Sequence, residues 1–207
     1  SYVLGHVNRV LNKNPYYRGQ VEDIDIALWR GAYQIIGLRI EKTEGGIPAP
    51  LFHTPIIDLS IQWREIFRGR LVGEIEVQRG TLNFVHGPSR KESQDGSEGD
   101  WIATVRDLFP LKINRFQVND SEIHYRDFSS SPNVDIYLAE VNGSATNLTN
   151  SLKLSANRVA HIELSAIAQN HSAASLKMDL DPFSRRPDFY LAAELKSLKL
   201  KALNDFL

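Results

Sequence analysis

Residues 75–84 read IEVQRGTLNF and residues 116–125 read FQVNDSEIHY, and the two segments align at an offset of 41 residues. In this alignment Ile75 matches Phe116, Val77 matches Val118, Leu82 matches Ile123, and Phe84 matches Tyr125. Gly80 falls opposite Ser121, where the apolar residues change from one set of alternate positions to the other. A one-residue slip moves side chains to the other face of a sheet, so the change predicts a bulge or tight turn. Repeated short strands also indicate a sheet that grows by adding strands, as solenoids do.

The same two-residue period runs through most of the chain. It is the pattern of strands with one buried face. The alternating apolar residues are Ile24, Ile26, Leu28, then Ile36, Leu38, Ile40, then Ile57, Leu59, Ile61, then Ile75, Val77, then Ile136, Leu138, then Ile162, Leu164, then Leu176, Met178, Leu180, and finally Phe189, Leu191, Leu195. The pattern predicts about ten to twelve strands, far above ordinary strand content.

Three segments depart from the strand pattern. Residues 1–14 place apolar residues at helical spacing and stop at Asn14-Pro15, which predicts an N-terminal amphipathic helix. Residues 101–109 suit a short helix closed by Pro110. Residues 87–100 contain no large apolar side chain and predict a mobile, solvated loop.

These patterns favour a mainly β protein. We expect residues 15–207 to form one elongated β domain, built as a curved antiparallel sheet with an apolar groove. Alternation shows which side of the strands is apolar but not what covers it, so a closed β-sandwich is the alternative.

Composition excludes several classes of function. The chain has 207 residues and a net charge of −1. Its sequence contains no dense cluster of Lys and Arg residues, so we do not expect it to bind nucleic acid. It has no cysteine, which removes disulfide frameworks, thiol catalysis and cysteine-ligated metal centres. We therefore expect no cofactor and no metal site.

No motif in the sequence predicts catalysis. The six histidines form no metal-binding pair, and there is no Gly-rich phosphate loop or nucleophile elbow. The run Ser129–Pro132 is interpreted as a turn, because nothing near it in sequence supplies a base for a serine nucleophile. We expect a protein that is not an enzyme.

The order of segments resembles a known family. A short helix is followed by PYYRGQVEDIDIALWRGAYQIIGLRIEK (15–42), TPIIDLSIQWREIFRGRLVGEIEVQRGTLNFV (54–85) and, after the second helix, LKINRFQVNDSEIHYRDF (111–128). The later stretches DFSSSPNVDIYLAEVNGSATNLTNS (127–151) and MDLDPFSRRPDFYLAAELKSLKLKALNDFL (178–207) fit the same order. The chain is similar to the AsmA-like superfamily of bacterial envelope proteins, and to a branch known only as a domain of unknown function.

The resemblance implies a cellular setting. AsmA-like proteins are anchored in the inner membrane of Gram-negative bacteria by an N-terminal helix and project into the periplasm. That helix would precede Ser1, and this chain would be a fragment of a longer protein. Their sheets curl into an apolar groove, and larger relatives are thought to carry phospholipids between the two membranes. No catalytic residue carries over.

The resulting hypothesis is a lipid-binding module whose groove holds phospholipid acyl chains and contributes to lipid transport or outer-membrane homeostasis. An envelope scaffold that binds protein partners through its sheet edges is the alternative, and an enzyme acting on envelope polysaccharide is the third. The expected groove residues are Ile24, Ile26, Leu28, Ile57, Leu59, Ile61, Ile75, Val77, Phe116, Val118, Ile136, Leu138, Ile162, Leu164, Leu176, Met178, Leu180, Leu191 and Leu195.

Overall fold

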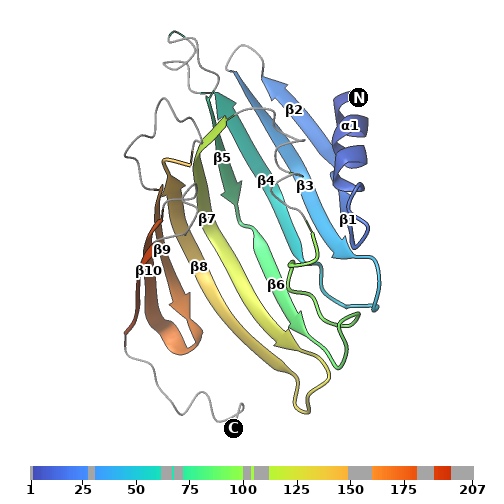
Figure 1. Cartoon of the computed structure of the whole chain (residues 1–207), viewed down its shortest axis with the longest axis vertical. Coiled ribbons are helices and arrows are strands. Elements are labelled where there is room, and N and C mark those ends of the chain that lie inside the picture. The colour runs from blue at the N-terminus through green and yellow to red at the C-terminus, as the bar shows by residue number, and fades with distance from the viewer. Residues whose placement is uncertain are drawn as a thin grey trace.

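The computed structural model describes residues 2–27, 31–61, 67, 72–99, 104, 112–148, 160–180 and 189–196 (Figure 1). The elements are α1 (Tyr2–Leu11), β1 (Tyr17–Gln20), β2 (Asp23–Ala27), β3 (Ala32–Lys42), β4 (Phe52–Ile61), β5 (Val72–Gln78), β6 (Thr81–His86), β7 (Lys112–Asp127), β8 (Val134–Thr146), β9 (Ala160–Ala168), the 3-10 turn η2 (Gln169–His171), β10 (Ser172–Leu180) and β11 (Phe189–Leu195). The helix expected near 101–109 lies outside the described residues, apart from Thr104.

The strands form one mixed sheet of eleven strands with two open ends. Its main order is β1-β3-β4-β5-β7-β8-β9-β10-β11, with β2 beside β3 and β6 between β4 and β7. Figure 1 shows the sheet bending round from β2 on one side to β9 and β10 on the other. The mainly β class with a single curved sheet is confirmed, and the sheet is not closed into a sandwich.

The repeated segments lie side by side. Strands β5 and β6 both pair with β7 in parallel, while the other pairs are antiparallel. The register joins Ile75 to Phe116, Val77 to Val118, Leu82 to Ile123 and Phe84 to Tyr125, which are the pairs that the sequence alignment matches. The expectation of an entirely antiparallel sheet is therefore wrong at β7, because the second copy of the repeat adds to the first in the same direction.

A line of left-handed residues crosses the sheet and changes which side chains face the core. Gly37, Arg79, Asp120 and Glu140 have φ values of 65°, 53°, 47° and 49°. We call these four residues the seam. Across Gly37 the buried residues Ile35 and Leu38 are three positions apart instead of two. The parity change predicted from sequence beside Gly80 and Ser121 is confirmed, with a register shift in β7 between Val118 and Ser121.

Helix α1 covers the apolar side of the sheet at its N-terminal end. Val7 and Leu11 join a buried cluster with residues of β2, β3, β4 and β5. Gly19 allows this contact, since a Cβ there would lie 2.6 Å from the Leu11 Cβ. Asn8 accepts a hydrogen bond from the Val21 N–H, and the Asn12 amide donates to the Gly19 carbonyl. The amphipathic helix expected within residues 1–14 is confirmed.

Residues 87–99, which we call the strap, pack against the sheet. Gln94 is fully buried and forms a bridge with Val85, with N–H to carbonyl distances of 2.8 and 2.7 Å. Its side-chain amide donates to the Ala49 and Asn83 carbonyls. The prediction of a solvated loop is wrong at Gly87 and Gln94, which are buried, whereas Pro88–Glu92, Asp95 and Ser97 are exposed as expected. Its mobility stays a prediction.

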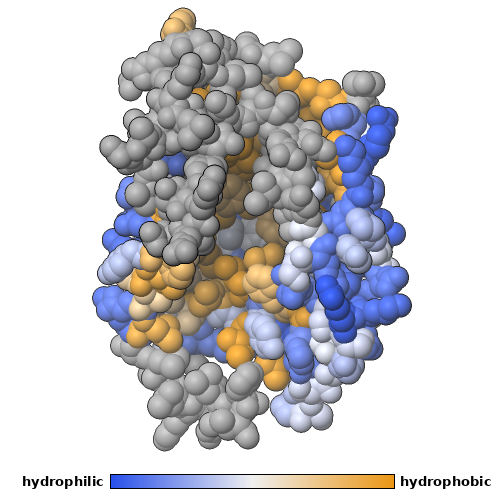
Figure 2. Space-filling view, in the orientation of Figure 1, coloured by the Kyte–Doolittle hydropathy of each residue, from blue (hydrophilic) through white to orange (hydrophobic). Residues whose placement is uncertain are grey.

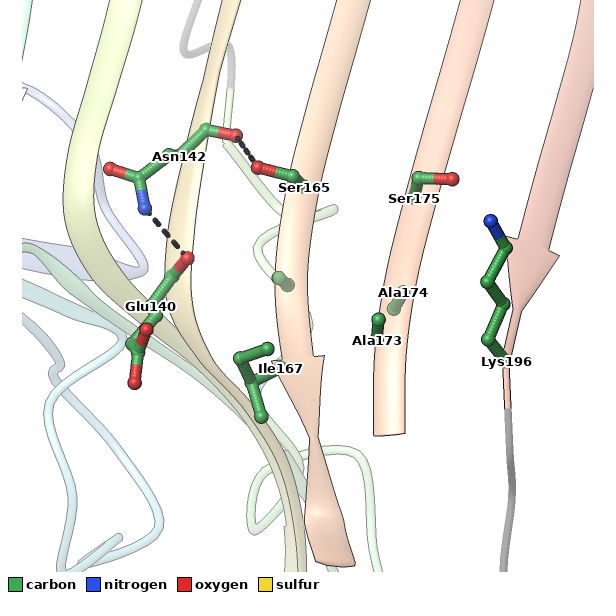
Figure 3. Close-up of a pocket in the computed structure, with 9 residues that line it drawn as sticks. Glu140, Asn142, Ser165, Ile167, Ala173, Ala174, Ser175 and Lys196 are labelled. Carbon is green, nitrogen blue, oxygen red and sulfur yellow. Dashed lines mark hydrogen bonds between the residues drawn. The ribbon is translucent and has the colours of Figure 1, made fainter. Parts of the chain in front are cut away.

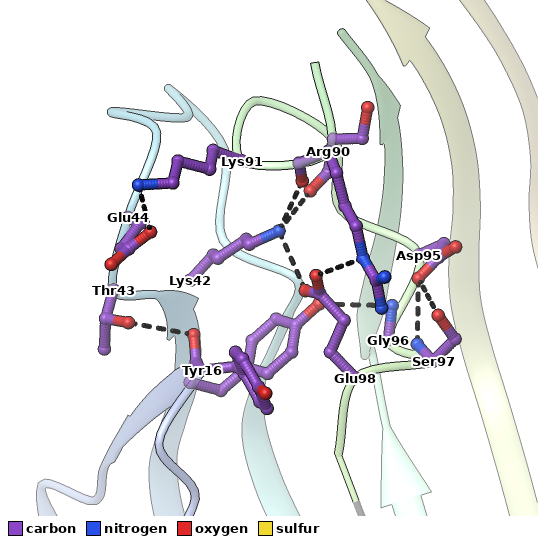
Figure 4. Close-up of polar contacts among 12 residues, drawn as sticks. Tyr16, Lys42, Thr43, Glu44, Arg90, Lys91, Asp95, Gly96, Ser97 and Glu98 are labelled. Carbon is purple, nitrogen blue, oxygen red and sulfur yellow. Dashed lines mark hydrogen bonds and ion pairs between the residues drawn. The ribbon is translucent and has the colours of Figure 1, made fainter.

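An ion pair joins the strap to β3 (Figure 4). The Lys42 ammonium lies 2.8 Å from the Glu98 carboxylate, and the two side chains are 4% and 9% exposed. Lys42 also donates to the Arg90 and Ser93 carbonyls. The Gly96 N–H donates to the Tyr17 hydroxyl at 3.2 Å.

The serine run forms the turn between β7 and β8. The Asp127 carboxylate accepts hydrogen bonds from the N–H and hydroxyl groups of both Ser129 and Ser130. These bonds, first among them that from the Ser129 hydroxyl, hold the pKa of Asp127 well below its usual range. A carboxylate that accepts several hydrogen bonds is stabilised in its charged form. The interpretation of this run as a turn is confirmed.

Exchanging residues in the seam tests its backbone argument. Gly37→Ala places a Cβ in the left-handed region, which costs about 1–2 kcal/mol. Arg79→Gly relieves a similar cost, offset by the larger entropy of unfolded glycine, for a net gain below about 1 kcal/mol. In urea titrations we expect the free energy of unfolding to fall for Gly37→Ala and to hold or rise for Arg79→Gly. Equal losses in both variants would contradict the seam.

The Lys42–Glu98 pair predicts a loss of stability in acid. The hydrogen bond from Lys42 is the main cause that holds the pKa of Glu98 below its usual range. A carboxyl group whose pKa is lowered in the folded state adds stability at pH values above its pKa in the unfolded chain, and this contribution disappears as the pH falls through the folded-state pKa. We expect Glu98→Gln to lower stability at pH 7 by on the order of 1–3 kcal/mol and to reduce the loss between pH 7 and pH 3. An unchanged pH profile of thermal unfolding would refute this role.

Candidate functional site

The register of the sheet gathers apolar side chains on one face. Residues that are directly opposite in neighbouring strands point to the same side, so each row can be followed across the sheet. One row is Ile24, Ile35, Ile57, Val77, Val118, Gly143, Leu164, Leu176 and Ala193, and the next is Ile26, Tyr33, Leu59, Ile75, Phe116, Ala145, Ile162, Met178 and Leu191. Both rows run from β2 to β11.

The opposite face is polar. The row between the two apolar rows is Asp25, Gln34, Asp58, Glu76, Gln117, Ser144, Glu163, Lys177 and Ala192. Its side chains bond to one another: the Gln34 amide donates to the Asp58 carboxylate, and the Lys177 ammonium lies 3.2 Å from the Glu163 carboxylate. The sheet therefore has one face with polar side chains and one face with apolar side chains.

In β2–β5 most of the apolar face is closed core, although Ile26 is 42% exposed. Ile24, Ile57, Leu59, Ile75 and Val77 belong to the buried cluster that Val7 and Leu11 of α1 join at one end, and Leu59 is only 3% exposed. As packed, these five expected groove residues contact protein, so the structure corrects the expectation of one uniform groove. Leu28 lies outside the described residues.

In β7–β11 the same face is more open, and we call this region the open apolar face. Phe116 is 37% exposed and Leu191 is 47% exposed, and Leu195 is exposed as well. The remaining expected residues on this side are half-buried: Val118, Ile136, Leu138, Ile162, Leu164, Leu176, Met178 and Leu180. Figure 2 shows apolar residues gathered in a hollow at the centre of the molecule.

A small cavity lies at one end of the apolar face. It has a volume of about 210 Å³ and is lined by residues of β2, β3, β4, β5 and β7, among them Ile26, Tyr33, Ile61 and Ile113. Burial raises the pKa of the Tyr33 hydroxyl, as expected in an apolar surrounding. Ile26 and Ile61, both expected from sequence, are therefore brought to a cavity wall.

Some residues of the apolar face were missed from sequence. Tyr33 and Ile35 face the apolar side, whereas the strand pattern through Ile36, Leu38 and Ile40 placed Ile36 there. At Gly37 the apolar side chains of β3 change from one set of alternate positions to the other. The glycine at this position was the feature of the sequence that could have predicted the change. A glycine within a strand pattern often marks such an irregularity.

A cleft of about 330 Å³ with a mixed polar and apolar lining opens beside the bulge at Glu140 (Figure 3). The Asn142 amide donates to the Glu140 carbonyl at 2.8 Å, and the Ser165 hydroxyl donates to the Asn142 carbonyl at 3.3 Å. Glu140 and Lys196 lie on its rim. The described lining residues include two serines, Ser165 and Ser175, and no hydrogen bond joins either hydroxyl to the Glu140 carboxylate or the Lys196 amine.

A histidine cluster lies on β7 and β8. His124 Nδ1 lies 2.7 Å from an Asp135 oxygen, and His124 Nε2 lies 3.2 Å from Glu122. Its ring stacks on Tyr137 with centroids 5.4 Å apart. The hairpin register creates this cluster, which sequence spacing alone did not reveal. Both ring nitrogens of His124 contact a carboxylate and the ring stacks on Tyr137. These contacts fit a histidine that stabilises the β7–β8 hairpin.

Within the described ranges, no three histidine, cysteine, aspartate or glutamate side chains come together in a way that could hold a metal ion. In the same part of the chain, no helix is both long and apolar enough to cross a membrane.

No protein-family model matches the chain, and no curated protein matches it. The open apolar face is therefore the strongest candidate site on its geometry alone.

Alanine substitutions of two leucines on the apolar face test whether its β2–β5 part is packed core and its β7–β11 part is open. Leu59→Ala leaves a cavity in the core and should cost about 2–5 kcal/mol of unfolding free energy. Leu176→Ala removes the same atoms from a half-buried position, so we expect a loss below about half of that. Chemical denaturation of the two variants measures both losses. Equal losses would mean that both halves are packed core.

Proposed function

We propose that the chain is a non-enzymatic lipid-binding module of an AsmA-like envelope protein, in which the open apolar face holds phospholipid acyl chains. The single observation that supports this function is the continuity of the two apolar rows beyond the closed core, through Phe116 and Met178 to Leu191. The resemblance to AsmA-like proteins would add the periplasm of a Gram-negative bacterium and an inner-membrane anchor. Both belong to the proposal.

The energetics of an acyl chain suit such a face. Each methylene group that leaves water contributes about 0.8 kcal/mol, so even a partly covered chain is held by several kcal/mol. Hydrophobic contact has no preferred direction. An acyl chain could therefore move along the row from β7 to β11 without losing a fixed polar contact, as transport between membranes requires.

The polar side chains of the sheet lie where they would not contact a bound acyl chain. The charged and amide side chains of the middle row point to the opposite face, where Gln117 bonds to Asn119 at 3.1 Å. An acyl chain on the apolar side would thus meet few buried polar groups, which are costly when they lose their partners. A scaffold that binds partner proteins through sheet edges remains the second candidate, supported by the exposed residues of β11.

Photo-crosslinking at neighbouring positions tests the lipid proposal. Benzoylphenylalanine at Phe116 replaces an aromatic side chain that is already exposed on the apolar face, and the same probe at Gln117 faces the polar side. In protein exported to the periplasm of a Gram-negative host, we expect phospholipid adducts at position 116 to exceed those at 117 at least tenfold by mass spectrometry. Equal yields at both positions, or no adduct at either, would reject acyl-chain binding on this face.

A further inference from the structure

Three loops meet at one end of the sheet and enclose a cleft of about 190 Å³. They are the β3–β4 connection (43–51), the strap and the β7–β8 turn (128–133), and they lie at the lower end of the sheet in Figure 1. All residues of these three segments are described, and none of the lining residues belongs to the two apolar rows. The cleft is therefore separate from the open apolar face. An apolar cavity of about 150 Å³ holds a benzene molecule, so this cleft has room for one large side chain.

Contacts between and within the loops fix the walls of the cleft. Gly45 has a φ of 85°, and a Cβ there would lie 2.0 Å from the Lys91 carbonyl oxygen, so glycine lets the β3–β4 connection lie directly against the strap. The Lys91 ammonium lies 3.4 Å from the Glu44 carboxylate (Figure 4). Within the strap, the Gly87 N–H donates to the Ser93 hydroxyl at 3.0 Å. Because the walls are held before a ligand arrives, binding costs little ordering of the protein.

An exposed aromatic ring forms part of the apolar wall. The wall contains Ile47, Pro88 and Phe128, and Phe128 is 38% exposed. Exposed aromatic side chains in a preformed pocket are typical anchors for a binding partner. The face of an aromatic ring also attracts a cation.

The charges around the cleft favour a cationic ligand. Glu92 lines the cleft, and Asp127 directly precedes Phe128 and is held in its charged form by the serines of the turn. Among the described residues, no lysine or arginine forms an ion pair with either carboxylate. The cations nearby already have partners, since Lys91 lies against the β3–β4 connection and Arg90 lies 3.2 Å from a strap glutamate. Two carboxylates beside an aromatic ring therefore lack a positive partner.

We propose that this cleft binds an arginine side chain of a partner protein. The guanidinium stacks on the ring of Phe128 and donates hydrogen bonds to the Glu92 carboxylate. Its planar face and forked donors suit both contacts at once, whereas the lysine ammonium is a point charge without such a face. The aliphatic stem of the arginine covers Ile47 and Pro88. This interaction does not depend on lipid binding by the sheet.

Nuclear magnetic resonance titration of the whole chain tests the proposal. The probes are the blocked tripeptide Ala-Arg-Ala and the same peptide with citrulline, which keeps the shape of arginine without its charge. We expect saturable amide shifts at Gly46, Gly87 and Ser129 with the arginine peptide and none with the citrulline peptide. Phe128→Ala should raise the dissociation constant about two- to fivefold, through loss of the cation–π contact.

Matched variants separate the cleft from general surface effects. Glu92→Gln should raise the dissociation constant about twofold, and exposed residues elsewhere, Phe189→Ala and Glu194→Gln, should leave it unchanged. Circular dichroism checks that each variant is folded. Equal shifts with both peptides, no shift at the cleft, or binding that Phe128→Ala leaves unchanged would each overturn the proposal. Shifts caused by phosphoethanolamine but not by the arginine peptide would assign the cleft to a lipid headgroup and would also overturn it.

Discussion

The structure depends on one constraint. A sheet with a single apolar face must keep that face continuous along its long strands, and β3, β4, β7 and β8 each have at least ten residues. Strand β7 spans Lys112–Asp127, and an unbroken twist over such a length would turn its apolar residues away from the core. The seam residues lie in β3 (Gly37), in the link between β5 and β6 (Arg79), in β7 (Asp120) and in β8 (Glu140). The pairing of β3 with β4 and of β5 and β6 with β7 keeps its register past the seam, while the pairs β7–β8 and β8–β9 shift register beside it.

Three of the four seam residues are not glycines, although the left-handed region favours glycine. A non-glycine residue in the left-handed region costs about 1–3 kcal/mol and persists only where its surroundings hold it. At Arg79 the backbone N–H donates to the Asn119 carbonyl at 2.9 Å, and at Asp120 the N–H donates to the Asn142 side chain. The neighbouring strand therefore supplies the bonds that hold the strained backbone, so the seam and the pairing of the repeats stabilise each other.

Much of the fold could be predicted from sequence because period and turns report local geometry. The match between residues 75–84 and 116–125 predicted strand addition, and the structure places these residues in direct parallel register. The strap could not be predicted in this way, since Gln94 and Lys42 are anchored by partners distant in sequence. The candidate site was predicted only in part. Alternation identified the apolar side, but the burial of Leu59 and the exposure of Leu191 depend on what covers each half.

We propose that the open apolar face holds acyl chains, and native mass spectrometry of the chain mixed with phosphatidylethanolamine and phosphatidylglycerol tests this proposal most directly. The account predicts bound phospholipid on the wild type, loss of it in Met178→Glu, and retention in Lys177→Glu, whose side chain points to the polar face. A lipid-free wild type, or the same lipid occupancy in Met178→Glu as in Lys177→Glu, would contradict it.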